Sequence, residues 1–367
     1  MKHFVNRRNF VLGSAAALSL GAIARTASTQ PAAALKAPVV DSLVVQIVTD
    51  SSYDTPRAMS HKLVKVRRKG FTAAPNTKTL HSEWGLAMTL ESRIGTDTRY
   101  LMLDYGYTPE ALVNNIEFIG VDTSKIQGLI MSHGHFDHFG GLMAFLQKHR
   151  DALPADVKLY AGGEDNFCHR MSGAPGQFSD FGTLDRRELA GFKVTPVLGE
   201  KPMVIEGHAF TTGKIARNSI ERVLPNSHVE FGIKDGLGCN AAQYVSADMV
   251  GKSVPDQHLH EHATCFNVKG KGLVVISSCG HAGIVNSVRQ AQEVSGIEKV
   301  HAIVGGFHLG PAPKDYLTQV VGEIKKLKPD VLIPMHCSGL NFVQEARAQM
   351  PENVLVTTTG SRITFGA

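Results

Sequence analysis

The chain has 367 residues, of which 43% are hydrophobic and 19% are charged, and its formal net charge is +5 at pH 7. Most of this charge comes from residues 1–34, which contain no acid, so the rest is nearly neutral and gives no electrostatic reason to expect nucleic acid or an anionic membrane as a partner. Outside that segment no charge-free apolar run of about 18 residues occurs, which argues against an integral membrane protein.

The N-terminal segment is predicted to be an export signal. In "NRRNFVLGSAAALSLGAIA" the twin arginine Arg7 and Arg8, with Phe10, precedes an Ala- and Gly-rich run that is too short and too weakly apolar to span a bilayer. These residues resemble the twin-arginine export motif. We therefore expect residues 1–34 to be a twin-arginine signal and the mature protein to be periplasmic, without stable membrane insertion after cleavage. A disordered basic tail is the alternative.

The first half of the chain predicts mainly strands. Continuous apolar segments rich in β-branched residues are typical of buried strands, and apolar residues three or four positions apart are typical of helices. On these patterns we expect strands at 41–50, 85–92, 99–106 and 125–132, and helices at 109–120 and after Gly141.

The second half divides into two parts. Residues 164–262 are rich in Gly, Pro, Ser and Asn with short apolar pieces, and we expect them to be partly strand and partly a cover over an active site. From residue 272 onward strands and helices alternate. Strands first, then this alternation, indicate an α/β protein with two layered halves in one domain, 35–367.

The sequence "SHGHFDHFGG" places three histidines and an aspartate, His133, His135, Asp137 and His138, directly after the strand expected at 125–132. Such side chains make a poor core, because each needs hydrogen-bond partners when buried. Neutral imidazoles and a carboxylate are ligands for zinc, and also for iron or manganese. We therefore predict a centre with one or two metal ions; a solvated loop with chance histidines is the alternative.

This motif resembles the signature of the metallo-β-lactamase superfamily, and "LDYG" at 103–106 resembles the strand end that precedes it there. The resemblance implies a four-layered αββα sandwich with metal ions at one edge between the two sheets. It also implies that His133, His135 and a later histidine hold one ion, while Asp137, His138 and a final histidine hold the second.

Further segments resemble one branch of that superfamily, named for 7,8-dihydropterin-6-methyl-4-(β-D-ribofuranosyl)aminobenzene 5'-phosphate synthase. The segments that carry this second resemblance are 81–91, 212–221, 272–288, 305–310 and 334–339. A shared branch name is weak evidence for an activity, because function depends on the site rather than on the fold.

The later ligands are expected where strands of the C-terminal third end. His281 is predicted to complete the first metal site and His336 the second. His308 is either a ligand or a residue that orients one. No aspartate stands where a bridging carboxylate usually lies, and Cys279 or His281 takes the nearest place, so either water alone bridges two ions or only one site is filled.

Several residues near the predicted ligands each have two interpretations. Cys279 and Cys337 are thiolate ligands or small buried residues. Arg217 forms a helix-surface pair with Glu221 four residues later, or contacts a substrate anion. Glu83 either makes structural hydrogen bonds or belongs to the site.

The remaining histidines and cysteines indicate a role in the site less specifically. His258, His260 and His262 would share one face if they lay on a strand, as a metal-binding patch, a pocket wall or a solvated edge. The five cysteines show no CxxC spacing, and one disulfide is possible.

We expect a metal-dependent hydrolase in which a metal-bound hydroxide attacks an ester, lactone or phosphoester of a small-molecule substrate. Asp137 would orient the nucleophile and carry a proton to the leaving group. The alternatives are a dihydropterin phosphate synthase-like transferase and a non-catalytic metal- or ligand-binding protein.

Overall fold

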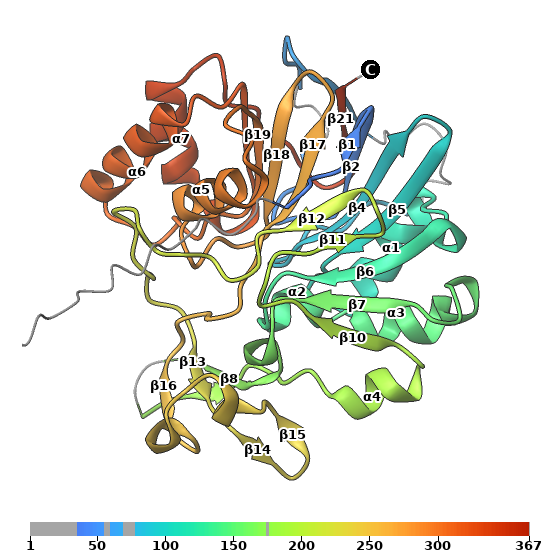
Figure 1. Ribbon diagram of the computed structural model, residues 1–367, viewed down its shortest axis with the longest axis vertical. Coiled ribbons are helices and arrows are strands. Elements are labelled where there is room, and N and C mark those ends of the chain that lie inside the picture. The colour runs from blue at the N-terminus through green and yellow to red at the C-terminus, as the bar shows by residue number, and fades with distance from the viewer. Residues whose placement is uncertain (1–34, 55–58, 69–77, 174–175, 367) are drawn as a thin grey trace, which may run out of the picture. The chain divides into compact units, whose positions relative to one another are not determined.

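Two β-sheets form the centre of the computed structural model, which describes residues 35–54, 59–68, 78–173 and 176–366 (Figure 1). The first sheet has the order β10-β7-β6-β5-β4-β2-β21-β3. Its strands are β10 (Thr195–Leu198), β7 (Lys158–Ala161), β6 (Ile126–Met131), β5 (Asp97–Leu103), β4 (Ala87–Ile94), β2 (Ser42–Thr49), β21 (Ser361–Gly366) and β3 (Lys65–Arg68). The export signal expected at 1–34 lies outside the described residues.

The second sheet has the order β11-β12-β17-β18-β19-β20, and β1 pairs with β17. Its strands are β11 (Val204–Ile205), β12 (Ala209–Thr211), β17 (Thr264–Val268), β18 (Gly272–Ser277), β19 (Val300–Gly305), β20 (Val331–Pro334) and β1 (Val39–Val40). Strands β18, β19 and β20 are parallel, as are β5, β6, β7 and β10 in the first sheet. Parallel strands bring their carboxyl ends to one edge, where ligands usually bind.

Three apolar clusters show the layering. One lies between the sheets and joins residues such as Ile47 and Leu101 to Ile276 and Ile333. A second packs the outer face of the first sheet against α1 (Pro109–Ile119) and α3 (Leu142–His149), and a third packs the second sheet against α5 (Ile284–Ser295), α6 (Lys314–Lys326) and α7 (Leu340–Gln349). The expected αββα sandwich is confirmed.

The burial of the central strands explains why their sequences do not alternate. All six residues of β19 are buried, because this strand has the intersheet core on one side and helices on the other. Strand β21 carries the alternation of a strand with one exposed face. The strands expected at 41–50, 85–92, 99–106 and 125–132 are confirmed as β2, β4, β5 and β6, and the helices expected at 109–120 and after Gly141 as α1 and α3.

Helix α1 begins and ends where local chemistry requires it. The Thr108 hydroxyl accepts a hydrogen bond from the Ala111 amide, and Pro109 occupies the first helical position, where its missing N–H costs nothing. The helix ends at Gly120, whose φ of 77° lies in the left-handed region. The start of α1 matters for the site because the Glu83 carboxylate accepts hydrogen bonds from the Tyr107 and Thr108 amides there.

The segment 164–262 serves two purposes. Helix α4 (Arg186–Gly191) precedes β10, and β10, β11 and β12 extend the main sheets. The remaining strands form a four-stranded sheet, β16-β13-β8-β9, and a hairpin. Their bounds are β8 (His169–Ser172), β9 (Ser179–Asp180), β13 (His228–Glu230), β14 (Ile233–Lys234), β15 (Leu237–Gly238) and β16 (Ser253–Pro255). We call this part, residues 168–173, 176–185 and 227–256, the cover.

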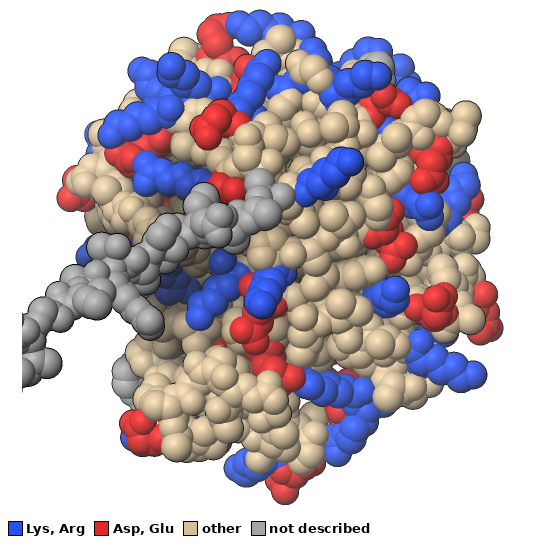
Figure 2. All heavy atoms as spheres, viewed as in Figure 1, with Lys and Arg blue, Asp and Glu red and all other residues tan. Residues whose placement is uncertain are grey.

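A disulfide between Cys168 and Cys239 joins parts of the cover that are 71 residues apart. Cys265, Cys279 and Cys337 are free and buried. None of the described helices has both the length and the apolar character that crossing a bilayer requires. On the face visible in Figure 2, Lys and Arg are interspersed with Asp and Glu.

Candidate metal centre

The histidines expected as ligands meet at one edge of the sandwich. His133 and His135 follow β6, His281 follows β18, His308 follows β19 and His336 follows β20. All these strands end at the same edge, and all these histidines except His308 are buried.

The loop after β6 is shaped by a glycine and a short helix. A Cβ atom at Gly134 would lie 2.3 Å from Arg170 Nη1 and 2.5 Å from the Asn166 carbonyl oxygen, so only glycine fits between His133 and His135. Helix α2 (Phe136–Phe139) follows and carries Asp137 and His138 on its single turn. One short loop therefore presents four possible ligands to a common space.

Asp137, His138 and His336 form what we call the second ligand group. Asp137 Oδ2 lies 3.7 Å from His138 Nε2 and 3.3 Å from His336 Nε2. Ligand atoms about 2.0–2.1 Å from a tetrahedral zinc ion are about 3.3 Å apart, so these three atoms are spaced to share one ion.

Asp104 orients His138. Its Oδ2 lies 2.7 Å from His138 Nδ1 and also accepts from the Ser132 hydroxyl, while its Oδ1 accepts from the Ser132 amide. This leaves His138 Nε2 free to face an ion, the carboxylate–histidine arrangement common at zinc sites. The "LDYG" resemblance assigned Asp104 no role, because the contact joins the end of β5 to helix α2, 34 residues away.

His133, His135, His258 and His281 form the first ligand group. The ring centroids of His133 and His135 are 4.8 Å apart, and the rings of His258 and His281 are stacked at 3.7 Å. Ligand atoms of His135, His258 and His281 all lie within 4.8 Å of one another. The first group thus offers four imidazoles where three were expected, and His258 is the addition.

Cys279 lies between the two groups. Its sulfur falls within 4.8 Å of ligand atoms of His133 and His281, and within the same distance of ligand atoms of His138 and His336. It therefore stands where the bridging carboxylate was missing from the sequence. Cys337 Sγ is 3.1 Å from Cys279 Sγ and accepts from the His308 amide.

Unpaired nitrogens show that this arrangement suits a metal ion. Buried polar atoms normally have hydrogen-bond partners. Among the described residues, the ring nitrogens without one include both of His281 and one each of His133, His138, His258 and His308. Burial without a partner is costly for a core residue, whereas a bound ion would satisfy one nitrogen of each imidazole that ligates it.

Burial also keeps the first group ready to bind. Desolvation holds the pKa values of His133, His135, His258 and His281 well below the usual value. Repulsion from neighbouring imidazoles lowers these pKa values further, and for His258 the charge of Arg170 comes before the imidazoles. A neutral imidazole is the form that ligates metal.

Backbone strain concentrates at the centre. His258, His308 and His336 have φ values of 46°, 45° and 49°, in the left-handed region that residues with a side chain rarely adopt. Such strain persists only where the surrounding structure enforces it, and it is common at functional sites.

A buried chain of polar groups supports His135 from the cover. His135 Nε2 lies 2.7 Å from the Ser227 hydroxyl, which donates to Asp256 Oδ2 at 3.2 Å. Arg170, fully buried, donates to Asp256 at 2.6 Å and to Asp165 at 3.0 Å. These hydrogen bonds occupy Nε2 of His135 and leave its Nδ1 as the nitrogen that can bind an ion.

The histidines at 258–262 do not lie on a strand, so the expectation of one shared face is wrong. They occupy a loop that ends before β17, and the turn at His258 sends the three rings to different places. His258 Nε2 lies 3.1 Å from Asn226 Oδ1 at the centre. His260 accepts from the Asp165 amide, and His262 contacts the Met131 carbonyl.

Arg217 and Glu221 do not form the helical pair that their spacing allowed, because residues 212–221 are not helical. Arg217 donates to the carbonyl oxygens of Gln257 and His258. Glu221 accepts from the Ser219 hydroxyl and the Asn286 amide. Arg217 therefore fixes the loop that carries His258.

Glu83 and Glu261 act through the backbone. Glu83 accepts from the Tyr107 amide at 2.8 Å and the Thr108 hydroxyl at 2.6 Å. Buried Glu261 accepts from the His281 and Ala282 amides, and burial raises the pKa of its carboxyl. Glu261 thus ties the His281 turn to the loop of His258, which explains their stacked rings.

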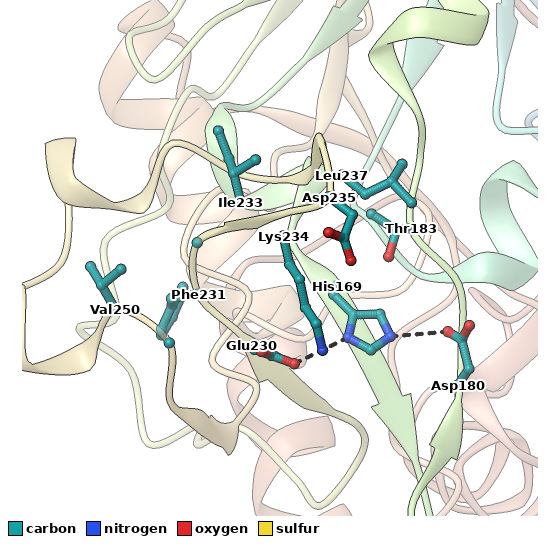
Figure 3. Close-up of a pocket in the computed structure, with 12 residues that line it drawn as sticks. His169, Asp180, Thr183, Glu230, Phe231, Ile233, Lys234, Asp235, Leu237 and Val250 are labelled. Carbon is teal, nitrogen blue, oxygen red and sulfur yellow. Dashed lines mark hydrogen bonds and ion pairs between the residues drawn. The ribbon is translucent and has the colours of Figure 1, made fainter.

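A cavity of about 200 Å³ opens onto the two groups. Its described lining includes His135 of the first group, Asp137 and His336 of the second, and residues of the cover; the full set is Trp84, His135, Asp137, Ser172, Phe181, Asn226, Ser227, Cys279, His308, His336 and Cys337. A larger cavity of about 410 Å³ lies within the cover, where His169 sits between Asp180 and Glu230 beside the exposed Ile233 (Figure 3). It contains none of the ligand groups.

Comparison with known proteins agrees with this geometry. Residues 92–218 match the model of the metallo-beta-lactamase superfamily. A solved metal-dependent hydrolase of the beta-lactamase superfamily aligns with 87% of this chain and 98% of its own, with a TM-score of 0.62 and 19% identity. The chain has the metallo-β-lactamase fold. The resemblance expected from the "SHGHFDHFGG" motif is confirmed.

Two curated relatives come from Methanocaldococcus jannaschii. A 7,8-dihydropterin-6-methyl-4-(beta-D-ribofuranosyl)-aminobenzene-5'-phosphate synthase is 26% identical over 70% of this chain and 82% of its own. An uncharacterized protein is 24% identical over 67% of this chain and 82% of its own. The metallo-β-lactamase fold generally binds metal ions, and the two ligand groups contain clusters of side chains that could hold them.

Proposed function

We propose that this chain is an exported metal-dependent hydrolase that acts on an ester or lactone of a small molecule. The observation that carries the proposal is that His135, Asp137, His308 and His336 line one open cavity, and that the buried rings of His133, His138, His258 and His281 pack against His135 or His336. The first ligand group and the second would each hold an ion, zinc being the ion that this donor set favours, with iron or manganese as alternatives.

The chain's own residues supply the rest of the chemistry. A bound divalent ion lowers the pKa of a water towards neutrality and polarises the substrate's carbonyl oxygen. Asp137 Oδ2 lies between His138 and His336, while its Oδ1 is buried without a partner among the described residues. Burial acts to raise the pKa of Asp137, but the neighbouring imidazoles outweigh it and hold the pKa well below the usual range. The ionised carboxylate can therefore accept a hydrogen bond from a water and orient it for attack.

The lining of the cavity favours an ester or lactone over a phosphoester. Among its described residues there is no lysine or arginine, so a substrate phosphate would have only the ions and the histidines to bind it. Recognition of phosphate usually employs arginine or lysine forks. Arg217 does not line this cavity, and its guanidinium is used by backbone carbonyls.

A transferase is the second candidate, and the synthase relative is the observation that favours it. It predicts product formation that needs two organic substrates, without hydrolysis of either alone. A non-catalytic metal-binding protein predicts bound metal and no turnover of any ester or lactone.

We also propose that the protein is exported to the periplasm. The twin-arginine motif supports this proposal, and the Cys168–Cys239 disulfide is of the kind that persists in oxidising compartments. Replacement of Arg7 and Arg8 by lysine is expected to leave the protein in the cytoplasmic fraction; unchanged periplasmic recovery contradicts the proposal.

Metal analysis of the purified mature protein, combined with an ester and lactone screen, tests the hydrolase. We expect about two ions per chain, and we expect His135→Ala to lose turnover together with metal. His169→Ala is the matched control, because this histidine lines the other cavity (Figure 3). Full turnover by metal-depleted His135→Ala contradicts the proposal, and one ion per chain restricts it to a single site.

A further inference from the structure

Trp84 is the only tryptophan of the chain, and its side chain stands at the cavity of the metal centre. The residue is 56% exposed, and its ring centroid lies 5.0 Å from that of His336. A single exposed apolar residue is common on protein surfaces, so exposure alone marks no site. Position beside a ligand group is the feature that needs an explanation.

The backbone on both sides of Trp84 is anchored. The Glu83 amide donates to the Asp50 carbonyl and the Leu86 amide to the Asp137 carbonyl, each at 3.2 Å. The Glu83 carboxylate also accepts from the amides of Tyr107 and Thr108. Trp84 is thus exposed on a segment that is otherwise tied down.

Gly85 brings this segment against the metal loop. A Cβ atom at Gly85 would lie 2.7 Å from the Tyr107 amide nitrogen and 2.9 Å from the Asp137 carbonyl oxygen. Only glycine permits this approach, which places the backbone of Trp84 at a fixed distance from Asp137. A backbone that is already fixed has little conformational freedom left to lose on binding.

Phe181 brings a second aromatic ring to the same cavity from the cover. It is partly buried, and its centroid lies 5.3 Å from that of His135. Phe181 therefore stands beside the first ligand group, whereas Trp84 stands beside the second. The cavity has aromatic rings next to both groups and, among the described lining residues, no lysine or arginine.

We propose that Trp84 is a stacking platform that binds a planar, uncharged ring of the substrate above the second ligand group, with Phe181 as a lateral contact. This inference rests on the proposed function and names its substrate class: an aryl ester or an aryl-substituted lactone. Aromatic pairs prefer offset or edge-to-face arrangements that a saturated ring of the same size cannot reproduce. Trp84 is therefore a residue that determines specificity.

Two carboxylates of equal charge and similar size, benzoate and cyclohexanecarboxylate, test the platform without requiring turnover. Both present the same group to the ions, and only benzoate is planar. Titration calorimetry on the zinc-loaded protein is expected to show about three- to tenfold tighter binding of benzoate. Benzoate is also expected to quench the fluorescence of Trp84, excited where benzoate does not absorb.

Variants separate stacking from other causes. Trp84→Phe should keep most of the preference for benzoate, whereas Trp84→Ala should reduce the ratio of the two dissociation constants to about one, with zinc content unchanged. Ile233→Ala is the control, because Ile233 is also exposed, at 65%, but lines the other cavity (Figure 3).

The outcomes distinguish this inference from the proposed function. Equal affinities in the wild-type protein, no binding of either carboxylate, or a preference that survives Trp84→Ala each overturn the platform, whatever the ester screen shows. A benzoate preference that depends on Trp84 supports the stacking platform. If the same protein hydrolyses no aryl ester or lactone, that result contradicts the proposed hydrolase function without affecting the platform.

Discussion

The two ligand groups are held by different parts of the molecule. The second group, Asp137, His138 and His336, lies entirely on loops of the sandwich, with Asp104 behind His138. In the first group His135 depends on Ser227 and Asp256 of the cover.

His258 also belongs to the first group, and it follows the last strand of the cover, β16. The second group therefore inherits the rigidity of the sheets, while the first depends on whether the cover is correctly folded. Occupancy of the first ion should report on the cover, and occupancy of the second should not.

The largest effect is expected from removing the carboxylate of the second group. Asp137→Asn keeps the shape of the side chain but removes its charge between His138 and His336. We expect loss of one ion per chain and a fall in kcat/KM of about 10³-fold or more, since a metal contributes several kcal/mol to the transition state. Metal analysis and ester turnover measure this. Asp180→Asn, in the other cavity, is the control, and two ions in the Asp137→Asn protein would contradict the assignment.

Removal of the Cys168–Cys239 disulfide should weaken the cover selectively. Replacing both cysteines by serine frees a loop of 71 residues, and we expect the free energy of unfolding to fall by about 2–4 kcal/mol. Urea denaturation measures this loss. The first ion should bind more weakly than in the wild type and the second should not. Equal weakening of both ions would show that the two groups are not held separately.

Two matched substitutions test the comparison directly. Asp104→Asn should lower the affinity for the second ion by about 10–100-fold and that for the first ion less, because Asp104 contacts His138 directly and His133 only through Ser132. Asp256→Asn should lower the affinity for the first ion alone by a similar factor, because it supports His135. Chelator competition followed by metal counting gives the two affinities. The proposed separation of the groups is wrong if either variant weakens both ions equally.

The division between the sandwich and the cover also explains which features could be predicted from the sequence. His133, His135, Asp137 and His138 are contiguous, and His336 ends a strand whose apolar pattern is unambiguous, so their meeting at one edge follows from the layering of the sheets. The sandwich was predictable because its central strands, such as β19, are buried on both faces and read as continuous apolar runs.

The residues of the site that the sequence did not reveal share one property, which is that their contacts depend on the complete fold. His258 approaches through a turn with a positive φ in a loop, which no alternation pattern reveals. Asp104 meets His138 across 34 residues, and Asp256 meets Arg170 across 86, so both contacts depend on the complete fold. The sequence marks Cys279 as a possible thiolate ligand and as the nearest substitute for an absent carboxylate, but its place between the groups required the structure.

The smallest effect is expected from Arg217, which touches the first group only through the backbone. Its guanidinium donates to the carbonyls of Gln257 and His258, and burial lowers its pKa without removing its charge. Arg217→Gln should therefore relax the His258 loop and weaken the first ion about threefold, with the second ion unchanged.

Arg187→Gln is the matched control, since Arg187 is exposed and pairs with Asp185 away from the centre. Zinc competition at equal protein concentration measures the change. A loss as large as that of Asp256→Asn would mean that Arg217 does more than hold the loop, and substrate binding by the guanidinium would then have to be reconsidered. An unchanged affinity would mean that the other contacts of the His258 loop, such as Asp256 with the His258 amide, hold it without Arg217.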